Sequence, residues 1–252
     1  MRLVVYNIRY GTGTGPAFHL PLPGAGYLRS SRRTLDQIAG FLRAQDPDIV
    51  GLIEVDTGSV RSGLINQAEY LARHLGHYTA YECKYGTASI NQQLPIIRKQ
   101  SNAFLAAPRV TGERFHYFPT GIKRLIIEIE LDDLCVFLVH LSLRYRHRQD
   151  QLRHLHDLIL RSEKPVIVAG DFNTFTGTNE LALFMSATGL RSANTAGLAS
   201  FPARIPQFEL DFVLASEEIA IKDFQIPDIR YSDHRPIICD FEVMAAKAST
   251  AA

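Results

Sequence analysis

Polar and ionisable side chains stand where several apolar runs of this sequence stop. The run 165–169 is followed by Gly-Asp-Phe-Asn, so Asp171 and Asn173 come two residues apart, and we expect them on the same side of a continuing strand. The other residues placed in this way are Asn7, Glu54, His140, Asp211 and the neighbours Asp233 and His234. Because ligands of α/β sheets bind at strand ends, we expect these side chains to converge on one site.

The residue types in this set favour hydrolysis at phosphorus. Oxygen ligands from Glu54, Asp171, Asp233 and Asn7, without thiolates, suit Mg²⁺ or Mn²⁺ rather than structural zinc. Histidines beside such a metal are typical of proton transfer and of charge stabilisation on phosphate. The set therefore predicts attack of water on a phosphoester.

Strand-length apolar runs recur along the chain and predict the elements that position these residues. They are RLVVYNI, DIVGLIE, NAFLAA, RLIIEIEL, CVFLVHL, PVIVAGD, LDFVLAS and PIICDFEV. Few of them alternate, which indicates strands covered on both faces. Helical patterns follow Ser31, which can cap a helix, and recur around 152–159 and 181–184. We predict a mixed α/β protein with two packed sheets and helices outside.

Six ordered motifs resemble the endonuclease/exonuclease/phosphatase superfamily. They are NIRYG, GLIEVD, VHLSL, GDFN, LDFVLAS and SDHRP, and the resemblance extends from Arg2 to Val243. It implies a deoxyribonuclease I-like four-layer α/β sandwich, a metal-dependent phosphohydrolase activity, and a single domain over residues 1–243 with a flexible tail at 244–252.

On the metal side, the resemblance implies that Glu54 is the main ligand, with Asn7 beside it and Asp233 as a second carboxylate. Some nucleases of the superfamily carry an acidic residue two places after the strand-one asparagine, where this chain has Arg9. A cation there weakens a second metal site and favours one catalytic Mg²⁺ (or Mn²⁺). Arg9 is also a candidate to hold a phosphate or carboxylate group.

On the phosphate side, the resemblance implies that Asp171 orients and deprotonates the attacking water, while Asn173 donates its amide to a phosphate oxygen. His140 and His234 flank the phosphate and stabilise its growing charge. Asp211 hydrogen-bonds His234 and favours its imidazolium form.

Further candidates for substrate binding are Asn102, Arg124 and Arg144. Each has an ordinary alternative: Asn102 can form a turn, Arg124 can be a solvated strand end beside Lys123, and Arg144 opens a charged run typical of a wet helical face. The segment 84–90 lies where relatives place phosphate-contacting loops.

Composition bears on the substrate. The 252 residues carry a net charge of +1, which argues mildly against non-specific cleavage of nucleic acid. The Gly- and Pro-rich segment 10–30 predicts a functional loop whose apolar residues contact a lipid tail or a membrane surface. We therefore favour a phospholipid or small-molecule phosphodiester, with a nuclease and a catalytically inactive binding module as alternatives.

The start of the chain is a strand without a signal-peptide run, which predicts a cytoplasmic location. The three cysteines, Cys83, Cys135 and Cys239, are widely spaced and odd in number, so we expect small buried hydrophobes rather than a disulfide framework. The sequence makes no prediction of oligomeric state.

Overall fold

The computed structural model describes residues 1–14, 30–83, 96–121 and 123–244. Most of the predicted 10–30 loop, the predicted 84–90 loop and nearly all of the 244–252 tail lie outside these residues.

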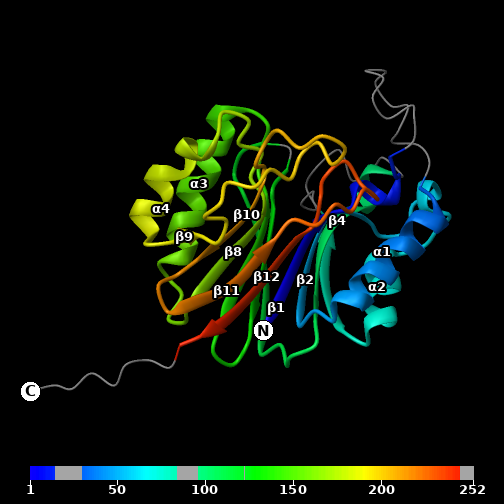
Figure 1. Cartoon of the computed structure of the whole chain (residues 1–252), viewed down its shortest axis with the longest axis horizontal. Helices are drawn as coiled ribbons and strands as arrows, with labels where there is room; N and C mark the ends of the chain where they lie inside the picture. The colour runs from blue at the N-terminus through cyan, green and yellow to red at the C-terminus, as the bar shows by residue number, and fades with distance from the viewer. Residues whose placement is uncertain (15–29, 84–95, 122, 245–252) are drawn as a thin grey trace, which may run out of the picture.

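Two six-stranded sheets form the centre of the protein (Figure 1). The first has the strand order β11-β12-β1-β2-β4-β3 and the second β5-β6-β7-β8-β10-β9. The strands of the first are β1 Arg2–Asn7, β2 Ile49–Asp56, β3 Tyr78–Cys83, β4 Gln100–Ala106, β11 Ile219–Gln225 and β12 Ile237–Val243. Those of the second are β5 Gly112–Tyr117, β6 Leu125–Glu130, β7 Cys135–His140, β8 Val166–Asp171, β9 Arg191–Ser192 and β10 Asp211–Ala215.

Each sheet has one parallel pair, β1 with β2 and β7 with β8, and its other pairs are antiparallel. Parallel neighbours need a crossover connection, which α1 Arg32–Gln45 and α3 Tyr145–Ile159 supply. The other helices are α2 Gln67–Leu75 and α4 Ala182–Thr188, with short 3-10 turns at η1 Arg9–Gly11, η3 Val60–Ser62, η5 Ile97–Lys99 and η6 Thr178–Leu181. The predicted cap is confirmed, because the Ser31 side chain accepts the Thr34 N–H.

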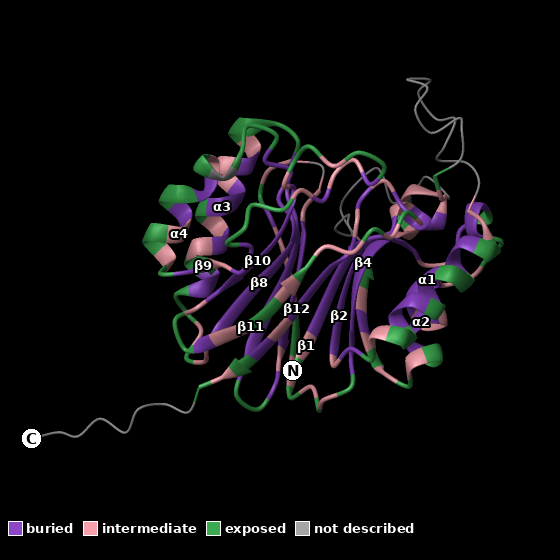
Figure 2. Ribbon diagram, viewed as in Figure 1, coloured by how far each residue is buried: buried purple, intermediate pink, exposed green. Residues whose placement is uncertain are grey.

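Three apolar clusters separate the four layers. Figure 2 shows the central strands of both sheets as mostly buried. One lies between the sheets and includes Leu3, Phe104 and Leu138. The second joins α3 and α4 to the outer face of one sheet, and the third joins α1 and α2 to the outer face of the other. Burial on both faces explains why the central strands read as continuous apolar runs. The predicted four-layer α/β sandwich is confirmed.

All eight predicted strands are present, but the sequence analysis missed β3, β5, β9, β11 and α2. The longer missed strands have mixed exposure: β3 and β5 are the outermost strands beside β4 and β6, and β11 lies at the opposite edge of its sheet. Edge strands carry charged side chains and therefore lack a continuous apolar run.

The burial of the cysteines differs from the expectation in one case. Cys135 and Cys239 are buried, whereas Cys83 is only half-buried because it ends the edge strand β3. In the part of the chain that the structure describes, no helix is long and apolar enough to cross a membrane.

Candidate active site

Three neighbouring strands of the second sheet place three predicted site residues in one row. His140 is in register with Asp171 across the parallel pair β7–β8, and Asp171 is in register with Asp211 across the antiparallel pair β8–β10. Residues in register on adjacent strands lie on the same face of a sheet. The strand pairing alone therefore brings one histidine and two carboxylates together.

The glycine of the GDFN motif allows this close strand pairing. Gly170 has a φ of 142°, and a Cβ built there would lie 2.0 Å from the Val139 carbonyl oxygen. Any side chain at Gly170 would force β7 and β8 apart directly beside His140 and Asp171. Only glycine therefore fits at position 170, directly before Asp171.

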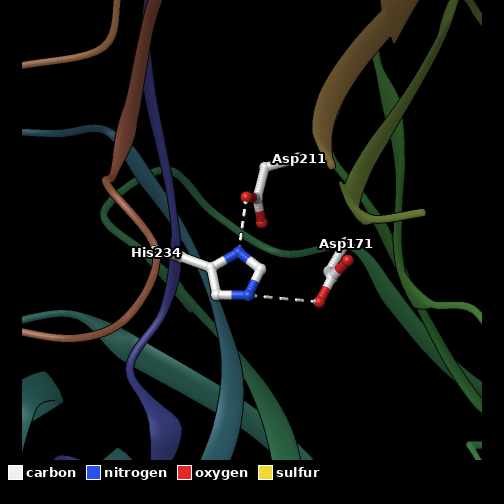
Figure 3. A group of neighbouring side chains, drawn as sticks. All are labelled: Asp171, Asp211 and His234. Atoms are coloured by element: carbon white, nitrogen blue, oxygen red, sulfur yellow. Dashed lines mark hydrogen bonds and ion pairs between the residues drawn. The ribbon is translucent and has the colours of Figure 1, made fainter. Parts of the chain in front are cut away.

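His234 lies between the two carboxylates, as Figure 3 shows. Its Nδ1 is 2.7 Å from Asp211 Oδ2 and its Nε2 is 3.9 Å from Asp171 Oδ2. The same Asp211 oxygen accepts a 2.6 Å hydrogen bond from the buried Ser200 hydroxyl. Ser200, which the sequence analysis did not single out, therefore fixes the carboxylate that orients His234.

The first sheet contributes Asn7 from the end of β1. Asn7 Nδ2 donates a 3.2 Å hydrogen bond to Asp171 Oδ2, and that oxygen is also 3.2 Å from His140 Nε2. The two sheets therefore meet at Asp171. Ile8 bonds the Ile53 carbonyl at 2.9 Å, which holds the ends of β1 and β2 together.

A β-bulge presents Glu54. The pairing of β2 with β4 shifts register between Leu52 and Val55, and Glu54 within this interval has a φ of 57°. Bulges re-aim side chains, and left-handed backbone at a residue other than glycine is strained and typical of functional sites. Asn102 Oδ1 accepts the Glu54 N–H at 3.2 Å, while Asn102 Nδ2 is buried and has no hydrogen-bond partner among the described residues.

Asn173 reaches the site by a route that the sequence analysis did not foresee. We expected it on the same side as Asp171 in a continuing strand, but β8 ends at Asp171 and Asn173 has a φ of 53°. The turn brings the Asn173 N–H to 3.0 Å from Asp171 Oδ1. Its side-chain Nδ2 donates to the Leu141 carbonyl at 2.9 Å.

Charges within the cluster set its protonation. Burial opposes ionisation of Asp171, but the adjacent His140 and His234 outweigh it and hold its pKa well below the usual value. Burial also opposes protonation of His234, yet Asp211 and Asp171 raise its pKa to about 10. Burial raises the pKa of Asp211. Near neutral pH the row therefore contains an ionised Asp171 beside an imidazolium at His234.

Glu54, Asn7 and Asp233 form the predicted metal side, and their chemistry suits a hard divalent cation. Burial, with a smaller contribution from the charge of Glu54, raises the pKa of Asp233. The negative charges of the buried Glu54 and the half-buried Asp233 repel each other, and a divalent cation would relieve this repulsion. Arg9 Nε is 3.6 Å from Asp233 Oδ2, so the arginine faces the metal-side carboxylate.

A different group of potential ligands, Asp171, Asp211 and His234, has ligand atoms within 4.8 Å of one another. His234 is poorly suited to be a metal ligand in this group. The short contact between His234 Nδ1 and Asp211 already occupies one ring nitrogen, and the raised pKa of His234 keeps the ring protonated.

Two arginines predicted to bind substrate, Arg124 and Arg144, have different surroundings. Arg124 Nε donates to the Phe118 carbonyl at 2.6 Å, and it is the neighbouring Lys123 whose Nζ contacts His140 Nε2. Lys123 therefore lies in the cluster, while Arg124 holds a backbone carbonyl through its Nε and its substrate role stays a prediction. Arg144 is exposed at the start of α3, so its substrate role stays a prediction.

One further cation of the charged run that Arg144 opens is turned away from solvent. Arg148 is buried and pairs with Glu180, and its Nη1 donates to the Ser142 carbonyl at 2.8 Å. It therefore fastens α3 to the η6 turn.

The chain is similar in fold to several solved proteins. A protein described as endonuclease/exonuclease/phosphatase from Beutenbergia cavernae DSM 12333 is 17% identical, with a TM-score of 0.74 over 98% of this chain and 72% of that one. The mannosyl-6-phosphatase Bt3783 of Bacteroides thetaiotaomicron is 14% identical, with a TM-score of 0.71 over 96% and 99% of the two chains. TDP2 of D. rerio, in complex with a single-strand DNA product, is 17% identical, with a TM-score of 0.68 over 96% and 98%.

A search of the curated proteins found no match to this chain. The model of the Endonuclease/Exonuclease/phosphatase family matches residues 4–234, which span every motif from β1 to His234. Members of this family are divalent-metal-dependent hydrolases that act on phosphoester bonds. With its sheets, its register row and its family motifs in agreement, the chain belongs to the endonuclease/exonuclease/phosphatase family.

Proposed function

We propose that the protein is a Mg²⁺-dependent phosphodiesterase that acts on a phospholipid or a small-molecule phosphoester. The observation that carries the proposal is the row of His140, Asp171 and Asp211, with His234 held between the two carboxylates. In this row the ionised Asp171 carboxylate can accept a proton from water, and the His234 imidazolium beside it supplies positive charge for a phosphate.

Asp171 is the proposed acceptor for the proton of the attacking water. Its lowered pKa keeps it ionised at neutral pH, and hydrogen bonds from Asn7 and from the Asn173 backbone fix its orientation. Fixed orientation counts because a base must lie within hydrogen-bond reach of the proton that it accepts.

His140, Lys123 and His234 are the proposed donors to the phosphate oxygens. Lys123 Nζ contacts His140 Nε2, and the Asp211–Ser200 pair holds His234 as an imidazolium. Donors fixed in advance stabilise the charge that grows on the non-bridging oxygens without reorganising during the reaction. Asn102 Nδ2, buried and without a described partner, is a further proposed donor.

Glu54, Asn7 and Asp233 are the proposed holders of Mg²⁺, which when bound neutralises charge on the phosphate. Arg9 beside Asp233 supports one metal rather than two, because its guanidinium already compensates part of the carboxylate charge there.

A substrate panel tests the proposal. Purified protein is assayed with Mg²⁺, Mn²⁺ or EDTA against bis-p-nitrophenyl phosphate, p-nitrophenyl phosphate, plasmid DNA, sphingomyelin, phosphatidylcholine and phosphoinositides. We expect EDTA-sensitive cleavage of the diesters, with the lipids or small molecules cleaved faster than DNA. Faster cleavage of DNA would replace this proposal with a nuclease, and no cleavage together with no Mg²⁺ binding would replace it with a binding module.

A further inference from the structure

Three phenylalanines form a continuous apolar surface that begins at the ring of His234. The Phe201 ring lies 4.8 Å from the His234 ring, centroid to centroid. Phe175 packs edge-on against Phe201 at 6.0 Å and against Phe208 at 5.5 Å. We call Phe175, Phe201 and Phe208 the aromatic shelf.

The outer part of the aromatic shelf is open to solvent. Phe175 is 41% exposed and Phe208 is 37% exposed, whereas Phe201 between them and His234 is half-buried. Isolated exposed apolar side chains need no explanation, but contiguous ones mark a binding surface. Here the contiguous surface starts at a residue proposed to contact the phosphate.

The backbone beneath the shelf is held firmly. Phe201 and Phe208 pair as an antiparallel bridge, with the Phe208 N–H donating to the Phe201 carbonyl at 2.8 Å. The same hairpin bonds the His234 segment on two sides: Ala203 N–H donates to the Asp233 carbonyl at 2.6 Å and Arg235 N–H to the Ser200 carbonyl at 2.8 Å. The shelf therefore has a fixed position relative to His234, which is what selection between substrates requires.

Phe175 is fixed from the other side of the site. It follows Asn173 by two residues, and its N–H donates to the Asn173 carbonyl at 3.1 Å. The adjacent Thr174 hydroxyl donates to the Glu209 carbonyl at 3.3 Å, which ties the GDFN turn to the segment just before β10 and Asp211. Phe175 thus comes from the segment that carries Asp171 and Asn173, whereas Phe201 and Phe208 come from the segment that leads to Asp211.

We propose that the aromatic shelf binds an uncharged apolar group that is ester-linked to the scissile phosphate, so that the protein selects diesters carrying an alkyl chain or a planar ring. The inference rests on the proposed function, because it assumes that the phosphate lies against His234. Its physical basis is the removal of apolar surface from water on the shelf when that group is bound.

Three matched substrates test the shelf: the methyl, n-octyl and thymidine 5′ esters of p-nitrophenyl phosphate, each below its micelle-forming concentration. The quantity compared is the ratio of kcat/KM for the octyl or thymidine ester to that for the methyl ester. We expect at least one ratio to exceed about tenfold and to fall about tenfold in Phe175→Ala and in Phe208→Ala, which corresponds to about 1.4 kcal/mol. Whichever ester carries the effect identifies the alkyl chain or the planar ring as the source.

Leu183→Ala is the matched control, since Leu183 is an apolar residue of α4 that is 80% exposed. It should leave both ratios unchanged. Phe201 is not substituted because it packs on His234, so its loss would disturb the proposed phosphate site itself. Ratios that are the same in wild type, Phe175→Ala and Phe208→Ala would overturn the proposal, even if all rates fell together.

Binding without turnover separates this inference from the proposed function. Calorimetry with n-octylphosphonate and methylphosphonate measures the contribution of the apolar group in the absence of cleavage. If no ester is cleaved, the proposed function fails, yet tighter binding of the octyl compound that is lost in Phe175→Ala still supports the shelf. Equal affinity for the two phosphonates, together with no cleavage, contradicts both.

Discussion

Two clusters of charge are buried to the same degree in this protein and differ in how their hydrogen bonds are satisfied. Asp56 at the end of β2 is fully buried, as are Asp171 and Asp211 to within 1%. The Asp56 carboxylate accepts hydrogen bonds from the backbone N–H groups of Gly58 and Ser59 and from the hydroxyls of Ser59 and Ser62. It also pairs with Arg61 at 2.8 Å.

The hydrogen-bonding groups of the candidate active site are satisfied only in part by the protein itself. Asp211 Oδ1 and Asn102 Nδ2 are buried and have no hydrogen-bond partner within the described residues. Buried polar atoms normally find partners. The carboxylates of Asp56 and Asp211 are equally buried, but both oxygens of Asp56 accept hydrogen bonds, whereas Asp211 keeps one oxygen without a described partner. The comparison teaches that equal burial can accompany different hydrogen bonding.

Removing the scaffold carboxylate should have the largest effect on stability. Asp56→Ala leaves Arg61 buried without its counter-charge, so the free energy of unfolding should fall by about 3–5 kcal/mol. Urea denaturation followed by circular dichroism measures this loss. A loss below about 1 kcal/mol would mean that the Asp56 cluster is not the self-contained scaffold described above.

Removing a residue of the site row should instead affect catalysis. His234→Ala should lower kcat by about a hundredfold, because a positioned donor to the phosphate is lost. The measurement is the rate at saturating substrate and Mg²⁺, with the melting temperature as the control for folding. If only KM rises, His234 binds substrate and takes no part in the chemical step.

Ser200 sharpens the comparison, because its hydroxyl makes a hydrogen bond within the protein and yet belongs to the site. Ser200→Ala removes the 2.6 Å hydrogen bond to Asp211 and should lower kcat by about tenfold, since a hydrogen bond to a charged group contributes about 1.5–3 kcal/mol. Ser192→Ala on β9 is the control, because the Ser192 hydroxyl accepts only from a backbone N–H in its described contacts. Equal rates in wild type and Ser200→Ala would remove Ser200 from the positioning of His234.

The last prediction concerns the pH dependence of stability. The pKa of His234 is raised from its usual 6.5 to about 10 in the folded protein, so its stabilising contribution is complete below pH 6.5 and is lost as the pH rises through 10. In EDTA, the difference in unfolding free energy between wild type and His234→Gln should therefore shrink between pH 6.5 and pH 10. His147→Gln on α3 is the control, and a difference that grows with pH would reverse the assignment of charge.

Most of the fold could be predicted from the sequence because the central strands are buried on both faces. Their apolar runs and the polar residues at their ends can be recognised without a structure, as β8 and Asp171 illustrate. Edge strands such as β5 could not be found in this way. Their side chains face solvent on one side, and their identity depends on pairing with β6.

The candidate site was predicted by residue but not by geometry. The bulge at Glu54 and the left-handed turn at Asn173 are set by long-range pairing, so no local sequence pattern predicts these backbone conformations. Lys123 and Arg124 are adjacent in sequence, and only the structure decides that the lysine contacts His140. Ser200, Phe201 and Phe208 lie in a segment without a motif, and only the structure brings Phe175, which follows the GDFN motif, against them.

The most direct test of the central claim is a single-turnover comparison of wild type and Asp171→Asn with bis-p-nitrophenyl phosphate in Mg²⁺. We predict EDTA-sensitive hydrolysis by the wild type and a rate lower by about a hundredfold or more in the variant. The variant should retain the melting transition and Mg²⁺ binding. A near-normal rate in Asp171→Asn would contradict the assignment of Asp171 as the proton acceptor and, with it, the account of the site row.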